Sequence, residues 1–278
     1  MKKLFVLLGV SLVVAIGFCG CGKEAEARAK EKAKARAKAE AEAEELLRNG
    51  VVTLPGDVQL KMIKVEPGSF RMGSENEEPV HQVTLTKPYY LGETEVTQAQ
   101  WRAVMGNNSS RFQGDSRPVE CVSWNDAMAF CKKLNDQGKA PEGWKFTLPT
   151  EAQWEYAARG GNRSRGYTYS GSNDVGEVAW YGNNSGRETH AVRQKEANEL
   201  GLYDMTGNVY EWCLDWFGSY SSSAVTDPQG PQSGSGRVLR GGSWVSYAQY
   251  CHVAQRSNYD PDYRYYYFGF RLALVRVQ

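Results

Sequence analysis

The chain has 278 residues, 41% of them hydrophobic, which is enough to bury the core of one large domain or two small ones. Its net charge of +1 argues against a nucleic-acid partner, because such partners usually select a strong positive field. Three scattered histidines and the absence of any Cys-x-x-Cys spacing give no indication of a catalytic triad or a zinc centre.

Residues 1–20 have the pattern of a bacterial lipoprotein signal peptide. A basic start, Lys2-Lys3, precedes an apolar run over 4–18 that is too short to span a bilayer. A glycine comes just before Cys21, which predicts cleavage there and lipidation of Cys21. We therefore expect a lipoprotein tethered to the membrane by its lipid and displayed on the outer surface of the cell. A plain signal peptide cut nearby is the alternative.

Residues 21–50 are rich in Ala, Lys, Glu and Arg, which favour a helix. Glu24 with Arg28, and Glu26 with Lys30, have the spacing of favourable ion pairs on a helix. No apolar stripe follows the helical period, so a coiled coil is disfavoured. The segment is predicted to be a solvated helical or partly disordered stalk. It either rests on anionic lipid or, as we favour, is a charged spacer.

The globular domain is expected over residues 51–278. Short strands are predicted at 62–65, 69–72, 83–85 and 89–91. The first two alternate on either side of Pro67-Gly68, which predicts a hairpin.

Three helices are predicted from their N-terminal capping signals. The capping pairs are Thr97 with Gln100, Ser123 with Asp126, and Thr150 with Gln153. Gly106 should close the first helix, because glycine readily adopts the left-handed conformation of a C-cap. From 161 to 235 the chain is rich in Gly, Asn, Ser and Tyr and is expected to be irregular, as functional segments of this length often are.

The C-terminal segment 270–277 alternates large apolar residues with others, which predicts a half-buried closing strand. Residues 263–268 would continue this alternation. Because both of their faces would then be aromatic or charged, some of these tyrosines are expected to face solvent.

The segment between the blocks Arg240–Trp244 and Gly269–Leu272 has an unusual composition. It contains seven of the 16 tyrosines of the chain, together with Ser, Gln, His, Asn and Asp. Antibody paratopes have a similar composition, in which Tyr supplies rigid contact area and the small polar residues supply adaptable hydrogen bonds. The alternative is a tyrosine-rich sheet face packed against the rest of the same protein.

Several ordered motifs resemble those of the formylglycine-generating-enzyme family. They are 67–73, 148–160, 201–205, 207–212, 240–244 and 269–271. The resemblance covers about residues 55–277. It implies an α+β fold, the C-type lectin fold of the formylglycine-generating-enzyme type, rich in irregular loops with a few short helices and antiparallel strands.

In the enzymes of this family, two cysteines five residues apart hold Cu(I). Matched residue by residue, the second falls on Cys251 and the first on Ser246. A serine hydroxyl is a poor ligand for Cu(I), which soft thiolates select. We therefore expect a protein that is not an enzyme and has no catalytic cofactor, with a copper-dependent oxidase or another enzyme of the same fold as the alternative.

The C-terminal pattern is also similar to the variable proteins of diversity-generating retroelements, in which scattered positions are diversified between fixed residues. The fixed positions here would be Ala248, Cys251, Ala254, Arg256, Pro261, Asp262 and Arg264. The diversified, ligand-contacting positions would be Val245, Ser246, Tyr247, Gln249, Tyr250, His252, Gln255, Ser257, Asn258, Tyr259, Asp260, Tyr263, Tyr265, Tyr266, Tyr267 and Phe268. The resemblance implies a surface receptor whose partner is a macromolecule, either a protein or a glycan. A fixed protein-docking scaffold is a second alternative.

The resemblance also implies roles for residues outside the C-terminal segment. Asn208, Val209 and Glu211 match a stretch that binds a structural calcium ion in the family, and their oxygen ligands suit Ca²⁺. The alternative is a loop in which Asn208 only caps turns. Glu151 and Glu155 would be hydrogen-bonded residues that build the fold rather than an acid–base pair. The pairing of the four cysteines beyond the signal, Cys121, Cys131, Cys213 and Cys251, is left open.

Overall fold

The computed structural model describes residues 19–277, which divide into a unit ending at Ala41 and a unit beginning at Glu42. The expected signal peptide, residues 1–20, lies outside the described residues except for its last two, and the side chain of Cys21 is not described. Within 19–277, no helix combines the length and apolar content needed to cross a bilayer.

The stalk is helical. Helix α1 covers Cys19–Asn49, and the expected pair of Glu26 with Lys30 forms at 3.2 Å. The compact domain begins at Glu42 rather than at residue 51 as expected. The reason is that the last turns of α1 belong to the domain: Leu46 is buried in its core, and Glu42 pairs with Lys139 at 2.9 Å.

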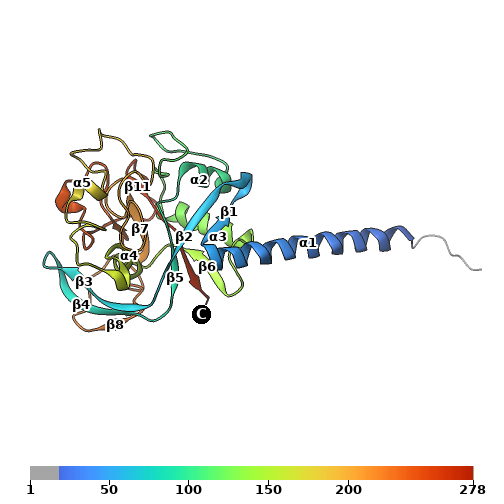
Figure 1. Ribbon diagram of the computed structural model, residues 1–278, viewed down its shortest axis with the longest axis horizontal. Helices are drawn as coiled ribbons and strands as arrows, with labels where there is room; N and C mark the ends of the chain where they lie inside the picture. Colours follow the sequence, from blue (N-terminus) through green and yellow to red (C-terminus); the bar gives the residue numbers. More distant parts are fainter. Residues whose placement is uncertain (1–18, 278) are drawn as a thin grey trace, which may run out of the picture. The chain divides into compact units, whose positions relative to one another are not determined.

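The described domain contains three sheets, and Figure 1 labels strands of each. The five-stranded sheet has the order β1 (Val51–Thr53), β2 (Gln59–Val65), β5 (Tyr89–Gly92), β12 (Ala273–Arg276) and β6 (Trp144–Thr147). The four-stranded sheet has the order β10 (Arg256–Tyr259), β9 (Arg237–Arg240), β7 (Tyr210–Trp216) and β11 (Phe268–Gly269). The three-stranded sheet has the order β3 (Gly68–Ser74), β4 (Glu77–Leu85) and β8 (Val225–Thr226). Pairing is antiparallel except for β11 with β7 and β4 with β8.

The predicted helices form where their caps indicated. Helices α2 (Gln98–Met105), α3 (Trp124–Asp136) and α4 (Glu151–Ala158) each begin with a complete capping box, and Gly106 closes α2 in the left-handed conformation. A short helix α5 (Val175–Val178) and single 3-10 turns at 55–57, 161–163 and 248–250 complete the elements. The mixture of helices and mainly antiparallel strands confirms the α+β class.

The predicted hairpin around Pro67-Gly68 is wrong, although both of its strands exist. Strand β2 pairs with β1 and β5, whereas β3 pairs with β4 in another sheet. The chain turns a corner here instead of folding back. Gly68 is suited to that corner because a Cβ at this position would lie 2.1 Å from the hydroxyl oxygen of Tyr156.

The closing strand also differs from the prediction. Strand β12 lies between β5 and β6, and residues 270–274 are all buried, so this part of the segment is covered on both faces, whereas Arg276 and Val277 are exposed. Residues 263–267 do not continue it but are irregular up to β11. The alternating pattern predicted one solvent-facing side because it includes the charged residue Arg271. In the structure Arg271 is fully buried beside Glu211. Strand β7 was not predicted within the stretch 161–235, which is otherwise mostly irregular, as expected.

Candidate functional site

The sixteen positions expected to contact ligand differ widely in exposure. Eight are exposed: Val245, Tyr247, Gln249, Tyr250, Asn258, Tyr259, Asp260 and Tyr263. Six are half-buried: His252, Gln255, Ser257, Tyr265, Tyr266 and Tyr267. We call residues 245–268 the variable segment.

The two remaining positions, Ser246 and Phe268, are buried, which corrects their assignment as ligand contacts. The Ser246 hydroxyl accepts a hydrogen bond from the Ser243 amide at 3.0 Å. Phe268 is 1% exposed and packs edge-on against Trp212 with ring centroids 5.3 Å apart. Both side chains therefore support the surface from within.

The variable segment concentrates the exposed apolar side chains of the protein. Of the seven large hydrophobic residues that are exposed in the described part of the chain, five belong to it: Val245, Tyr247, Tyr250, Tyr259 and Tyr263. Tyr247 is the most open, at 69% exposure. Exposed apolar groups that gather in one segment indicate an interaction site, whereas single ones scattered over a surface need no explanation.

Five tyrosines of the segment form a tyrosine ladder: Tyr259, Tyr263, Tyr265, Tyr266 and Tyr267. Tyr259 stacks on Tyr263 with centroids 4.9 Å apart, and Tyr263 stacks on Tyr265 at 5.9 Å. Tyr265 in turn contacts Tyr266 at 4.5 Å and Tyr267 at 4.4 Å. Such ring pairs add about 0.5–1.5 kcal/mol each beyond the area they bury, so the ladder is a rigid surface.

The ladder ends on Arg111, which the sequence did not single out, and on Trp244. The Arg111 guanidinium lies over the Tyr266 ring, 4.6 Å from its centroid, and also over Phe112. Trp244 contacts Tyr266 on one side and Phe112 on the other, at 5.7 and 5.4 Å between centroids. The loop between α2 and α3 thus extends the candidate surface beyond the variable segment.

The chain around the start of α3 holds the outer part of the variable segment. Arg264, one of the fixed positions, donates from Nε and Nη2 to both carboxylate oxygens of Asp126 at 2.6 and 2.7 Å. The Asn125 side chain donates to Asp262 at 2.6 Å. The backbone amide of Cys121 donates to the carbonyl of Tyr265 at 3.0 Å. These contacts fix the backbone of residues 261–265 without using the exposed tyrosine side chains.

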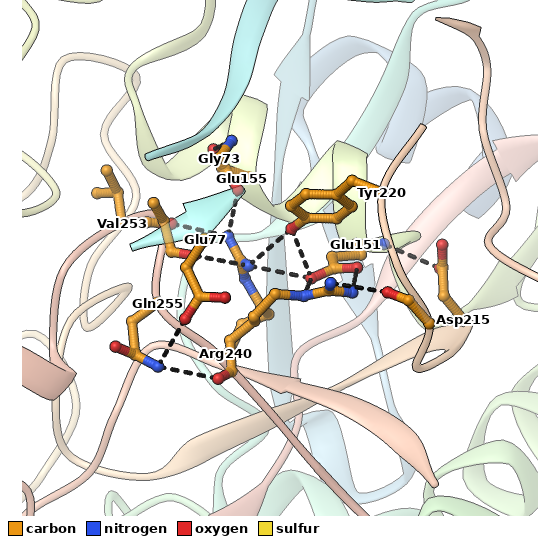
Figure 2. Close-up of polar contacts among 12 residues, drawn as sticks. Gly73, Glu77, Glu151, Glu155, Asp215, Tyr220, Arg240, Val253 and Gln255 are labelled. Atoms are coloured by element: carbon orange, nitrogen blue, oxygen red, sulfur yellow. Dashed lines mark hydrogen bonds and ion pairs between the residues drawn. The ribbon is translucent and has the colours of Figure 1, made fainter. Parts of the chain in front are cut away.

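A buried ionic network holds the other part of the segment, as Figure 2 shows. Arg256, a fixed position on β10, donates to both carboxylate oxygens of Glu151 at 2.8 and 2.7 Å. Arg240 on β9 donates to Glu151 at 3.0 Å and also to Glu155. The Tyr220 hydroxyl donates a hydrogen bond to Glu151 at 3.0 Å. Glu151 and Glu155 therefore have the fold-building role that was expected of them.

The same network fixes the backbone of the variable segment directly. Arg240 donates to the carbonyl of Val253 at 2.8 Å and to that of Ala254 at 3.1 Å. Because Arg240 and Glu155 are completely buried, these contacts are shielded from solvent and from any ligand. Hydrogen bonds to charged groups are stronger than those between neutral groups, so the backbone of 253–256 is firmly placed.

The residues expected to hold calcium are engaged with the protein itself. The Glu211 carboxylate accepts two bonds from Arg271, at 2.6 and 2.7 Å, and one from the Trp154 indole at 2.7 Å. The Asn208 side-chain oxygen accepts from the His190 amide at 2.9 Å, and the Val209 amide donates to Glu95 at 3.1 Å. No group of three or more His, Cys, Asp or Glu residues in the described part of the chain is placed to hold a metal ion. The side chains of Asn208 and Glu211 are thus bonded to the protein itself, and calcium binding at this stretch stays a prediction.

Glu95, which accepts from the Val209 amide, lies in a buried and acidic environment. Burial, together with the nearby carboxylates of Asp204 and Glu211, holds the pKa of Glu95 well above its usual range. Burial likewise raises the pKa of Asp204 to about 6.

The cysteines provide no reactive pair. All four in the described domain are free thiols, and Cys251 is fully buried. Burial raises the pKa of the Cys251 thiol to about 12, so it remains protonated at neutral pH. Ser246, at the position of the other cysteine, is committed to its contact with Ser243. The site therefore presents neither a thiolate nor an exposed nucleophile at this place.

Comparison with known proteins gives consistent relationships. The model of a family described as the sulfatase-modifying factor enzyme 1-like domain matches residues 53–276. The solved structure of Treponema denticola variable protein 1 superposes with a TM-score of 0.75 and 38% identity, over 80% of this chain and 97% of that one. A protein named chaperone protein LppX, from Paenibacillus barcinonensis, is 36% identical over 72% of this chain and 84% of its own length.

Relatives with this domain also include enzymes. The formylglycine-generating enzyme of Streptomyces coelicolor is 38% identical over 192 residues, which are 63% of this chain and 58% of the enzyme. Members of one family are thus named both as enzymes and as a variable protein. The fold alone does not decide between these activities, because function depends on the site.

Proposed function

This chain belongs to the sulfatase-modifying factor enzyme 1-like family, and from that premise we propose that it is a variable ligand-binding protein rather than an enzyme. Its domain has the C-type lectin fold of the formylglycine-generating-enzyme type. The variable segment would bind a macromolecular ligand, a protein or a glycan, and a retroelement would diversify it. The observation that carries this proposal is the gathering, in residues 245–268, of five of the seven large hydrophobic side chains that are exposed in the described part of the chain.

Within the variable segment, the fixed and the exposed positions have different contacts, which supports the proposal. Fixed residues such as Arg256 and Arg264 are engaged with the framework, whereas Tyr247 and Tyr250 have no ring partner in the described part of the chain. Substitution at positions 247 and 250 would therefore change the surface and leave the backbone in place. Tyrosine contacts of this kind commonly carry about 2 kcal/mol or more of binding free energy each.

The oxidase alternative lacks support at its reactive centre. The copper chemistry of the family's enzymes requires two thiolates, and this chain has Ser246 and a buried, protonated Cys251. We also propose that a lipid on Cys21 and the helical stalk display the domain on the outer surface of the cell. The expected signal sequence motivates that part of the proposal.

The capacity to bind through these positions can be tested with a designed library. The eight exposed positions of the variable segment would be randomised in the otherwise unchanged full chain, and binders would be selected against hen egg-white lysozyme. We expect folded binders whose melting temperatures lie within a few degrees of the parent. Replacing the selected residue at position 247 by Ala should abolish their binding. The control Leu47→Ala, at another exposed apolar residue, should leave binding unchanged.

A library that fails to fold would contradict the proposal, because it would mean that the exposed side chains maintain the structure. The docking-scaffold alternative makes a different prediction. It requires natural copies of the gene to keep residues 245–268 constant, whereas the proposed function requires them to differ mainly at the exposed positions.

A further inference from the structure

A second site lies beside the buried ionic network. A cavity of about 480 Å³ is bounded by β3, β4, β7, β8 and the loop that follows β7. Its lining includes Met72, His81, Asp215, Tyr220, Val225 and Arg256. Cavities of roughly 300–1,000 Å³ are typical of sites for small molecules. Among the lining residues only Arg256 comes from the variable segment, and it is a fixed position.

Two polar groups in this lining have unused hydrogen-bonding capacity. His81 bonds through Nδ1 to the carbonyl oxygen of Pro79 at 2.9 Å. A carbonyl oxygen can only accept, so Nδ1 carries a proton, and in the neutral imidazole Nε2 is then an acceptor. Asp215 accepts from the Glu151 amide at 2.9 Å with one carboxylate oxygen. Neither Nε2 of His81 nor the second oxygen of Asp215 has a hydrogen bond with another residue in the described chain.

The electrostatics of the lining favour an uncharged occupant. Arg256 and Glu151 form a bidentate pair and so neutralise each other. Burial raises the pKa of Asp215 to about 8, so at neutral pH its carboxyl is mostly protonated and able to donate. An ion entering this cavity would lose its hydration without gaining an unpaired counter-charge.

The walls of the cavity favour a planar group. Tyr220 and Trp216 supply aromatic surface, and the Tyr220 ring lies 5.0 Å from the His81 ring. Met72 and Val225 supply apolar surface. A flat ring with one donor and one acceptor at its edge would bury its apolar area here and satisfy both free polar groups.

We propose that this cavity binds an uncharged, planar carboxamide, whose N–H group donates to Nε2 of His81 and whose carbonyl oxygen accepts from the carboxyl group of Asp215. The site is separate from the variable surface. Its occupant would therefore be the same for copies of the protein that differ in their exposed variable residues, and its binding does not depend on the function proposed above.

The first test uses benzamide as the probe and benzoate, its anionic counterpart of equal size, as the matched ligand. Saturation-transfer NMR titrations with the full chain at pH 6.5 should show benzamide binding at least about tenfold more tightly than benzoate. Val225→Trp should abolish benzamide binding by filling the cavity. Ser222→Trp, on the same loop but outside the lining, should retain it. The melting temperature of each variant verifies its folding.

The second test uses pH to identify the carboxyl group. Benzamide affinity of the unmodified protein should fall as pH rises from 6.5 to 9, because Asp215 loses its donor proton. Asp215→Asn keeps a donor and should bind benzamide with little change over that range. Absence of benzamide binding, equal binding of benzoate, or full binding by a folded Val225→Trp protein would each overturn the proposal.

Discussion

The guanidinium group of Arg256 donates to both carboxylate oxygens of Glu151, at 2.8 and 2.7 Å. Arg256 lies inside the variable segment, whereas Glu151 begins helix α4 of the framework. The two side chains are 6% and 5% exposed, so the pair is not part of the exposed surface formed by the variable side chains. The segment is thus anchored from beneath while its neighbouring side chains remain free to change.

Loss of this anchor should destabilise the domain strongly. Arg256→Ala leaves Glu151 with one fewer buried cationic partner, and we expect a loss of about 3–5 kcal/mol in the free energy of unfolding, measured by urea denaturation. Arg264→Ala is the matched control. It also breaks a bidentate pair, but the Arg264 side chain is 54% exposed, so the expected cost is about 1 kcal/mol or less. Equal costs for the two substitutions would refute the anchoring role of Arg256.

Substitution of an exposed tyrosine and of the buried phenylalanine in the variable segment should have different effects on the free energy of unfolding. Tyr247→Ala is expected to change the free energy of unfolding by less than about 0.5 kcal/mol, because the side chain is exposed. Phe268→Ala should cost about 3–5 kcal/mol, because it leaves a cavity against Trp212. Thermal or urea unfolding of both variants measures this difference. A large loss for Tyr247→Ala would instead indicate a tyrosine face packed within the protein.

The raised pKa of Asp215 predicts how stability depends on pH. Its carboxyl has a pKa of about 8 when folded, against an ordinary value of 3.8. Between these values the folded protein holds one more proton than the unfolded chain. This group therefore lowers the free energy of unfolding as pH rises, by at most about 1.4 kcal/mol per pH unit, and its effect levels off above pH 8.

Asp215→Asn should remove that dependence. Its stability relative to the unmodified protein should increase from pH 5 to pH 8 and then stay constant, as measured by urea denaturation at four pH values. Other titrating groups, including Asp204, contribute to both proteins and cancel in the difference. A difference that is independent of pH would show that Asp215 is ionised throughout this range.

Copper-dependent oxidation should be absent. With Cu(I) and a cysteine-containing peptide, oxygen uptake by the full chain is expected to equal that of the Cys251→Ser variant, because a lone buried thiol cannot form the two-thiolate site. An oxygen electrode measures both rates. Uptake that disappears on Cys251→Ser would restore the enzyme assignment.

Local signals in the sequence predicted the helices well. Thr97, Ser123 and Thr150 begin α2, α3 and α4 as their capping boxes indicated, because a cap depends only on residues three positions apart. The corner at Gly68 could not be distinguished from a hairpin in the same way. Whether β2 pairs with β3 or with β5 depends on long-range packing, including the position of Tyr156.

The sequence also placed the candidate site within the variable segment, but not the exposure of each position in it. The alternating pattern in residues 263–268 suggested a strand, yet the chain there is held by the Cys121 amide and by the Arg264–Asp126 pair. Arg111 could not have been found, because nothing local indicates that it lies over Tyr266. Arg271 is buried by its ion pair with Glu211, so the charge of this residue concealed that residues 270–274 are all buried.

The most direct test of the central claim is to sequence the DNA that flanks this gene. We expect a near-copy of the codons for residues 241–271, with asparagine codons at the variable positions, beside a gene for a reverse transcriptase. The buried residues Arg240 and Arg271 should lie at or outside the limits of diversification, and the codon for Arg256 should be unchanged in the copy. Flanking DNA with no such copy, together with identical variable segments in related isolates, would contradict the claim that this surface is diversified.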